Sequence, residues 1–592
     1  MKQRVLKNED GYSFFIALLV SVLFIVLAVS LLSVTMAGLT KSTTREKIVQ
    51  STELADKGMT HIIQAIHTEL QDAVNPEGLP SEEFKMQLEG TLEDYRCDGG
   101  NKKLTIETET GKYEACIVAI EDEPGNPLRK IVTLESTGIV NDKKRTVTFA
   151  VKIGADPVPD ALNYALGVHK TCTRSKDCID GEGNLFLHGA SEIVGDLKVD
   201  GNIITTDRAY AYLNGEKWIE SLYPSIKSRH AMSSARLVLA GKIYTFSNRP
   251  SYNEHITRTN FNASGYKQAT VGEAFSDPPR LVQRSPVRQK IEITEQRQNY
   301  RFRINDAGVV KLNSGSDRTY QNEQHSGKKV FAYHSFCTLL IFCVDGTDGN
   351  YIMKGNNVFG QFATDGNLTI REGKATFENG LYVHGNLTIG NPNISQNEYN
   401  PDKYETIEIS GPIYVNGDVK IIGANVKFNS LIYVNGDTSR NDNEASVEIR
   451  NSQINGLQKD GKEGSLIIFA NKEIKIYNNS VKQNDPSRIR GFFYSEDALE
   501  MFGVGSNLRI EGGISARRIV LNAIRGRSSS TNFSGAQQIT RNDYYEGKAN
   551  QDGKNSRLTI IYNPEIINTY SDLKGQEPVI FEVSPPKIIE RN

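Results

Sequence analysis

Residues 11–40 read GYSFFIALLVSVLFIVLAVSLLSVTMAGLT and contain no charged side chain. Residues 14–32 within this segment are almost wholly apolar. A helix of about 20 apolar residues is long enough to cross a bilayer. A secretory signal peptide differs, because its apolar region has only about 7–15 residues and ends at a small-residue cleavage site. The segment therefore predicts a cell-membrane protein with a single N-terminal span.

A short basic leader stands before the apolar segment. It reads MKQRVLKNEDG and includes Lys2, Arg4 and Lys7. Basic residues favour the cytoplasmic side of a membrane, so we expect the bulk of the chain to be extracellular. The basic residues of 41–47, on the other flank, weaken this preference. The leader ends at Gly11, and the aromatic residue Tyr12 opens the apolar helix.

This arrangement resembles the type IV prepilin signal, in which a short charged leader ends in Gly and an aromatic residue opens a long apolar helix. The resemblance implies that a prepilin peptidase cleaves between Gly11 and Tyr12. It also implies that the helix packs with other minor or major pilins on a pilus assembly platform. Major pilins carry Glu at the fifth mature position, where this chain has Ile16. In this respect the chain resembles PilX-type minor pilins and pseudopilins, which lie at filament tips.

The apolar pattern continues beyond the membrane segment. Apolar residues recur mostly at spacings of three and four up to Leu70, which predicts one continuous helix over residues 12–74. Residues from about Tyr95 to Gly154 then alternate apolar and polar side chains, with a turn at Asn141-Asp142, and predict a small antiparallel sheet in a domain over residues 75–155. A long helix followed by such a sheet is the pilin-like α+β architecture. The resemblance therefore covers about residues 1–155.

The remainder of the 592-residue chain contains an internal repeat, so we expect at least one further domain. Tyr-Val, one residue, Gly and then Asn or Asp recur at 382–386, 414–418 and 433–437, with a weaker copy at 199–202. Short strands that turn at Gly and Asn can share one interior when they stack as coils. The repeat predicts a β-helix or β-solenoid over 156–220 and 331–592, with Asn residues stacked in ladders. A β-sandwich is the alternative. The fold class is thus mainly β with a long N-terminal α-helix.

Residues 221–330 depart from this pattern and predict a basic insertion. Between Ser221 and Val330 there are 18 Lys and Arg against 8 Asp and Glu, although the whole chain has a net charge of −2. Arg280, Arg284, Arg288 and Lys290 form a local basic run that is a candidate site for an anionic cell-wall polymer or DNA. A solvated loop without a ligand is the alternative. The overall charge excludes a uniformly basic nucleic-acid-binding protein.

Six cysteines form three close pairs in the sequence. An even number of cysteines in an extracellular chain predicts disulfides. Pairing between sequence neighbours is the simplest of the 15 possible connectivities. The spacings do not match the knuckle of a zinc site. The candidate disulfide cysteines are Cys97, Cys116, Cys172, Cys178, Cys337 and Cys343.

The sequence contains no familiar catalytic or nucleotide-binding motif. Asp177, Asp180 and Glu182 are spaced loosely like a calcium loop, but turn-forming residues produce such strings by chance. We therefore expect no metal and no cofactor. The resulting hypothesis is a non-enzymatic minor pilin-like protein that displays a solenoid head with a structural or adhesive role. The alternatives are a singly anchored polymer-binding protein and a β-helix polysaccharide-degrading enzyme, which needs a paired acid and base.

Overall fold

The computed structural model divides the chain into two compact units. The helix unit comprises residues 1–157 and 576–592, and the solenoid unit comprises residues 158–575. The structure describes residues 10–74, 81–123, 126–155, 159–172, 178–212, 216–230, 233–262, 265–284, 291, 293–313, 318–338, 342–346, 349–394, 400–436, 446–459, 461–480, 483–504, 506–526, 555–574, 581–583 and 587–591.

The helix unit begins with α1 (Asp10–Val74), a single uninterrupted helix, as the sequence predicts. It ends just before Asn75-Pro76, since a residue that precedes proline is disfavoured in a helix. A second helix, α2 (Ser81–Asp94), follows and was not predicted. Ile62, Ile66 and Leu70 of α1 are fully buried in the core of this unit, together with apolar residues of α2 and the sheet.

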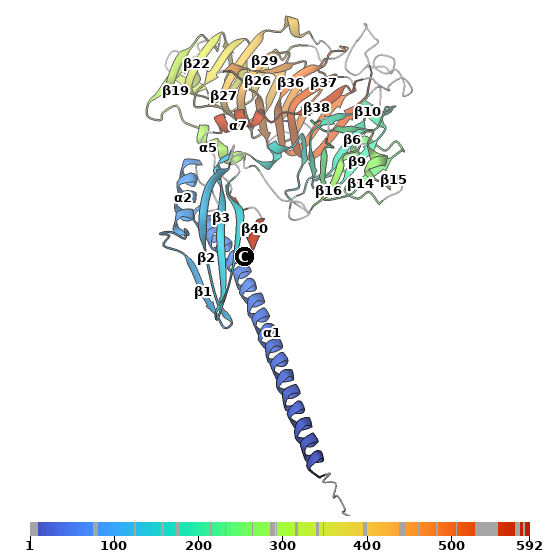
Figure 1. Ribbon diagram of the computed structural model, residues 1–592. Coiled ribbons are helices and arrows are strands. Elements are labelled where there is room, and N and C mark those ends of the chain that lie inside the picture. The colour runs from blue at the N-terminus through green and yellow to red at the C-terminus, as the bar shows by residue number, and fades with distance from the viewer. Residues whose placement is uncertain are drawn as a thin grey trace, which may run out of the picture. The chain divides into compact units, whose positions relative to one another are not determined.

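The sheet of the helix unit is antiparallel, as predicted. Its strands are β1 (Leu104–Thr108), β2 (Gly111–Glu123), β3 (Asn126–Val140) and β4 (Lys143–Ala155), each paired with the next. Two strands from the end of the chain, β39 (Phe581–Val583) and β40 (Lys587–Arg591), also pair antiparallel with β4. The sequence pattern predicts these residues as part of the solenoid. In the structure the chain instead leaves this sheet after β4, forms the solenoid unit, and then returns to the sheet as β39 and β40 (Figure 1).

The solenoid unit consists mainly of short strands that pair in parallel. Its first strands are β5 (Leu166–Val168), β6 (Leu185–Gly189), β7 (Glu192–Val194), β8 (Leu197–Val199), β9 (Ile203–Thr206), β12 (Ser225–Lys227), β13 (Arg236–Leu239), β14 (Ile243–Phe246) and β16 (Arg280–Gln283). A hairpin of β10 (Arg208–Tyr212) and β11 (Glu216–Glu220), the strand β15 (Tyr266–Gln268) and the short helices α3 (Tyr252–Ile256) and α4 (Val271–Ala274) accompany them.

The later strands form the longer part of the stack. They are β17 (Val309–Asn313), β18 (Thr319–Gln321), β19 (Gln324–Thr338), β21 (Asn350–Lys354), β22 (Asn356–Thr364), β23 (Asn367–Ile370), β24 (Gly373–Phe377), β25 (Leu381–Val383), β26 (Leu387–Gly390), β27 (Thr406–Val415), β28 (Val419–Ile422), β29 (Asn425–Val434), β30 (Val447–Arg450), β31 (Gln453–Gly456), β34 (Leu466–Ala470), β35 (Ile474–Ile476), β36 (Ser487–Gly503), β37 (Leu508–Ala523) and β38 (Leu558–Tyr562). The antiparallel partner of β19 is β20 (Phe342–Gly346), and α5 (Arg297–Tyr300) and α7 (Ile566–Leu573) are helices.

These strands form three parallel ladders, which is the arrangement of a β-solenoid. One ladder contains the sequence β24, β27, β29, β31, β36, β37 and β38. The second contains β25, β27, β29, β34, β36 and β37. The third contains β23, β26, β28, β30, β35, β36 and β37. A β-sandwich would pair its strands antiparallel, so the solenoid prediction is confirmed.

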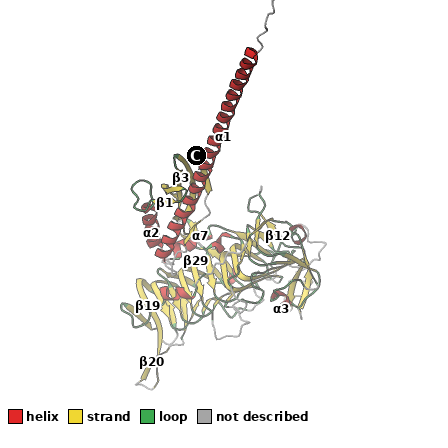
Figure 2. Ribbon diagram, turned by 90° about the horizontal axis from the view of Figure 1, so that it is seen from below, coloured by secondary structure: helices red, strands yellow, loops and turns green. Residues whose placement is uncertain are grey.

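The order of coils in space differs from their order in the sequence. The first coil stacks on the last, because β37 pairs with β5 and β6, and β38 pairs with β7. From there β8, β9, β12, β13 and β14 add coils in one direction, and the chain then returns from β17 towards β37. Figure 2 shows this succession from β19 past β29 to β12, and Figure 1 shows it from β19 past β29 to β9.

The predicted basic insertion is therefore corrected by the structure. Residues 225–246 are not an interruption, because β12, β13 and β14 continue the three ladders beyond β7, β8 and β9. The sequence hides this coil because its corners lack the Tyr-Val-x-Gly pattern. The described residues between β14 and β16, whose strand β15 pairs antiparallel with β14, and those between β16 and β17 add no strand to the parallel ladders.

The repeated Gly-Asn corners have a direct structural reason. Asn367 Oδ1 accepts a hydrogen bond from the backbone N–H of Asn386 at 2.7 Å, and Asn386 Oδ1 accepts one from Asp418 N–H at 2.8 Å. A Cβ at Gly385 or Gly417 would overlap the amide oxygen of the Asn in the preceding coil. Glycine therefore leaves the space in which the preceding Asn side chain binds, and the expected Asn ladders are confirmed.

The Tyr-Val pairs have separate functions in packing. The valines point into the solenoid core, whereas the tyrosines form a row on the outside of the second ladder. Tyr382 stacks on Tyr414 with ring centroids 5.9 Å apart, and Tyr433 stacks on Phe469 at 5.6 Å. The return segment and α7 cover this row with Ile293, Tyr300, Phe302, Ile566 and Tyr570. The outward-facing tyrosines and the residues that cover them thus form a second apolar core outside the solenoid interior.

Helix α1 approaches β3 so closely that one position requires glycine. A Cβ at Gly138 would overlap the backbone oxygen of Ser51, which belongs to α1. We predict that Gly138→Ala lowers the free energy of unfolding of the helix unit by about 2 kcal/mol, because the helix must move away from the sheet. Thermal unfolding of the purified chain in detergent, followed by circular dichroism, measures this loss.

Gly90→Ala is the matched control for this substitution. No atom lies within 4 Å of the Cβ position at Gly90 in α2, and alanine is the better helix former, so this variant is expected to gain up to about 1 kcal/mol. Equal stability of the two variants would show that the contact between α1 and β3 is looser than the structure describes.

Candidate functional site: the apolar helix and its neighbouring surfaces

The first half of α1 is an apolar surface that the rest of the chain does not cover. Tyr12 is 73% exposed, Phe24 66% and Leu31 73%. Among the described residues one helix, Tyr12–Ala73, is long and apolar enough to cross a membrane. Gly11 lies in the first turn of α1, and leader residues 1–9 lie outside the described residues. Ile16 is half exposed on this surface, at the position where the resemblance would place Glu.

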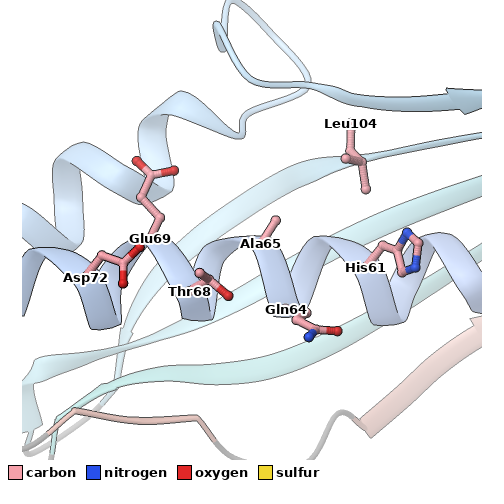
Figure 3. A pocket seen from close by; sticks show the side chains of 7 residues that line it. All are labelled: His61, Gln64, Ala65, Thr68, Glu69, Asp72 and Leu104. Carbon is pink, nitrogen blue, oxygen red and sulfur yellow. The ribbon is translucent and has the colours of Figure 1, made fainter.

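The second half of α1 borders an open groove of about 590 Å³ (Figure 3). The helix contributes His61, Gln64, Ala65, Thr68, Glu69 and Asp72, and Leu104 of β1 lies across from them. His61 Nδ1 is 2.6 Å from the hydroxyl of Tyr113, and Glu69 accepts hydrogen bonds from Tyr95 and Lys102. Several of its polar groups are thus already partnered within the unit. Five of its seven lining residues have polar side chains, and the other two, Ala65 and Leu104, are apolar.

Two of the predicted disulfides lie among the described side chains. Cys97 is bonded to Cys116, and Cys172 to Cys178, which matches the pairing of sequence neighbours. Cys337 and Cys343 are opposite each other in the backbone register of β19 and β20. Their side chains lie outside the described residues, so this third disulfide stays a prediction.

Glu182, which the sequence placed in a loose calcium-like string, has a structural role. Its carboxylate accepts backbone hydrogen bonds from Thr171, Cys172 and Ile179 at 2.9–3.0 Å and pairs with Arg517 at 2.6 Å. These bonds outweigh burial and hold the pKa of Glu182 below its usual range. The carboxylate oxygens thus already accept hydrogen bonds, and the sulfur atoms of Cys172 and Cys178 beside them are joined in a disulfide. Asp177 lies outside the described residues.

The predicted basic run is only partly described. Arg280 opens β16 and lies next to Arg236 of β13 in the parallel register. Arg284 follows the other end of β16 and is exposed. Arg288 and Lys290 lie outside the described residues. The two described members of the run are therefore separated by the length of a strand.

A carboxylate pair on the solenoid was not found from the sequence. Glu500 lies opposite Lys475 in the register of β36 and β35, and Lys475 Nζ is 2.9 Å from Glu473. Burial and the charge of Glu500 raise the pKa of Glu473 to about 7, and burial raises the pKa of Glu500. Stacking brings these carboxylates together across a gap of 27 residues, so no local motif reveals them.

A second cluster that the sequence did not reveal is a buried chain of hydrogen bonds. Asn522 donates from Nδ2 to the hydroxyl of Tyr252 at 2.9 Å, so its Oδ1 faces His188 Nδ1 at 2.8 Å and accepts from it. The Nε2 atoms of His188 and His255 are 2.9 Å apart, and His255 Nδ1 accepts from Tyr266 at 2.7 Å. These partners fix one neutral tautomer for each imidazole, since the shared bond holds one proton.

Comparisons with known proteins add little to this geometry. No family model matches the chain, and no curated protein matches it. Among solved structures, the crystal structure of the competence-associated pilin ComZ from Thermus thermophilus aligns at 10% sequence identity. The alignment covers 92% of this chain and 97% of that chain, with a TM-score of 0.19. A TM-score of this size carries no argument, and the fold assignment rests on the strand pairings above.

The buried histidines predict a specific pH dependence of stability. Burial lowers the pKa of His188 to about 4 and lowers that of His255 well below its usual range. The unfolded chain takes up protons below about pH 6.5 that the folded chain does not bind. The contribution of each histidine to stability is therefore complete above pH 6.5 and lost as the pH falls towards 4. For His188 alone the loss is about 3 kcal/mol.

His255→Gln tests this linkage, because Gln can donate and accept hydrogen bonds but does not titrate. We expect its unfolding temperature to fall less than that of the unmodified chain between pH 6.5 and pH 4. His230→Gln, at an exposed histidine, is expected to retain the full pH dependence. Identical pH profiles for all three proteins would contradict the buried neutral pair.

Proposed function

We propose that the chain is a non-enzymatic, pilin-like protein of the bacterial surface. Helix α1 anchors it in the cell membrane and joins or primes a type IV pilus-type filament. The solenoid unit is the extracellular head and has a structural or adhesive role. The observation that supports this proposal is α1 itself, whose apolar first half is exposed while its second half forms the core of an α+β unit.

An apolar helical surface of this length needs a partner other than water. The bilayer supplies one, since a helix satisfies its own backbone hydrogen bonds in lipid. Other apolar helices supply the second, and a filament core of pilin helices provides such a surface. Because α1 is continuous, a helix held in either environment is rigidly connected to the sheet of its own unit.

The proposed position is a filament tip or a priming complex. Ile16 places an aliphatic side chain where the resemblance to major pilins would place a carboxylate. The chain thus avoids the cost of burying a charge in an apolar setting, but it lacks the group that would pair with a neighbouring N-terminus. The proposed partners are a prepilin peptidase, other minor and major pilins and the assembly platform, and an anionic polymer is a further partner of the head.

The proposal predicts the mature N-terminus of the protein. Mass spectrometry of the protein purified from membranes of its own host should show a chain that begins at Tyr12. We expect Gly11→Val to keep residues 1–11 attached, because the branched side chain of valine does not fit a peptidase site that accepts glycine before the cut. Gly38→Ala, where no atom lies within 4 Å of the Cβ position, is the control and should be processed normally.

An intact N-terminus at Met1 in the unmodified protein would overturn the prepilin route. The alternative would then be a singly anchored membrane protein that never enters a filament. Cleavage beyond Leu32 would contradict both proposals, because the apolar segment would then be removed as a signal peptide.

The pair Glu473 and Glu500 supports one second candidate, a polysaccharide-degrading enzyme whose substrate would have to reach the partly buried Glu473 and the buried Glu500. A carboxyl group with a raised pKa can serve as a general acid at neutral pH. This candidate predicts that acidic polysaccharides incubated with the full chain yield new reducing or unsaturated ends, and that Glu500→Gln lowers the rate at least about 100-fold. Glu405→Gln, at an exposed position, is the control. Equal rates for both variants would exclude the pair as catalytic.

A further inference from the structure

A basic cavity of about 560 Å³ lies among the first coils of the solenoid unit. Its lining includes Arg229, His230, Arg236 and Arg280, with Asp196 as its acidic side chain and Tyr562 as its aromatic one. Three guanidinium groups thus face one carboxylate. The cavity lies where strands β8, β13 and β16 begin. These strands run parallel, so Asp196, Arg236 and Arg280 stand side by side at or just before their first residues.

The register places two arginines side by side. Leu197 pairs with Leu237, so Asp196 precedes the ladder next to Arg236, and Arg236 in turn pairs with Arg280. Asp196 accepts hydrogen bonds from Arg236 at 2.7 Å and thereby occupies one guanidinium. Among the residues that the structure describes, no carboxylate pairs with Arg280. Like charges opposite each other in a sheet are destabilising, so an anion beside Arg280 would relieve this repulsion.

The third arginine is held on the other side of the cavity. The guanidinium of Arg229 lies 5.3 Å from the ring centroid of Tyr562. A Cβ at Gly195 would be 2.7 Å from Tyr562 Cβ, so glycine at this position lets the tyrosine form the floor. Ser228 Oγ and Ser233 Oγ are 2.8 Å apart, and this bond closes the turn that carries Arg229.

We propose that this cavity binds a phosphodiester group of a polyol-phosphate or sugar-phosphate polymer. A phosphodiester offers acceptor oxygens in several directions, which suits guanidinium groups that approach from separate strands and a turn. A planar carboxylate needs only one guanidinium, and Asp196 already accepts the guanidinium of Arg236 at Oδ2 and the backbone N–H of Arg236 at Oδ1. The serine hydroxyls at the rim are suited to the hydroxyl groups of a polyol or sugar.

The lining favours this polymer over single-stranded nucleic acid. Proteins that bind single strands use several aromatic rings on which successive bases stack. Among the described residues that line the cavity, Tyr562 is the one Phe, Tyr or Trp, and Arg229 already lies over its ring. The inference deepens the proposed function, because it rests on an extracellular solenoid unit and names the class of polymer that the head meets.

The test uses the full chain in detergent and a fluorescently labelled glycerol-phosphate oligomer. Fluorescence anisotropy gives Kd at several salt concentrations for the unmodified protein, Arg280→Gln and Arg229→Gln. We expect each variant to weaken binding about tenfold, since each loses a charged hydrogen bond. The slope of log Kd against log salt should become flatter by about one for each charge removed.

Arg284→Gln is the matched control, because the structure places this member of the predicted basic run beyond the other end of β16 and outside the cavity, so it removes the same charge without changing the lining. It is expected to change Kd less than about twofold. Arg280→Lys keeps the charge without the planar fork and should lie between the unmodified protein and Arg280→Gln. If Arg280→Gln does not fold, as judged by circular dichroism, Arg280→Lys and Arg229→Gln carry the test.

Three outcomes would overturn the proposal. Equal loss of affinity in Arg284→Gln would show that binding is diffuse, and absence of binding by the unmodified protein would remove the site. Tighter binding of a single-stranded oligonucleotide of equal charge, dependent on Arg280, would assign the cavity to nucleic acid. None of these depends on cleavage at Gly11, so they are distinguishable from a failure of the pilin-like proposal.

Discussion

Close backbone approach between successive coils is the constraint on which the solenoid unit depends. At the corners Gly385-Asn386 and Gly417-Asp418 the absence of a Cβ makes room for the side-chain amide oxygen of the Asn in the preceding coil, and that oxygen accepts the backbone N–H of the next coil. One pair of residues thus turns the chain and sets the register with the neighbouring coil. The core follows from this register, because aliphatic residues of corresponding strands come to lie above one another. The row of tyrosines outside the second ladder is aligned by the same register.

The pairing of the first coil with the last joins segments that are about 350 residues apart in the chain, Leu166 and Ile514. Such long-range pairing incurs its loop-closure entropy before any contact offsets it. Until β37 arrives, the strands of the first coil present an unpaired edge. The arrangement also brings the beginning and the end of the solenoid unit to neighbouring coils, because α7 follows β38 and η1 (Asp160–Asn163) precedes β5. This is why the chain can return to the sheet from which it left.

The buried polar clusters described above have their hydrogen-bond partners within the chain, in contrast to two surface features. His188, His255 and Glu182 are buried with hydrogen-bond partners, so they stabilise particular contacts and have no capacity left for a ligand. The two surface features are different in kind. The first half of α1 is apolar and uncovered, and the cavity beside Arg280 has more guanidinium groups than carboxylates. The first feature suits lipid or apolar helices, and the second suits an anion.

Features encoded by local pattern could be predicted from the residues alone. They are the apolar helix over residues 12–74, the antiparallel sheet that follows, the stacked coils with their Asn ladders, and the described disulfide pairs. Local pattern could not show that β39 and β40 join β4, that 225–246 form a coil, or that Glu473 meets Glu500. It marked Arg280 as basic but could not place it beside Arg236. Each of these depends on contacts between residues far apart in the chain, and their partners become visible only when the coils have stacked.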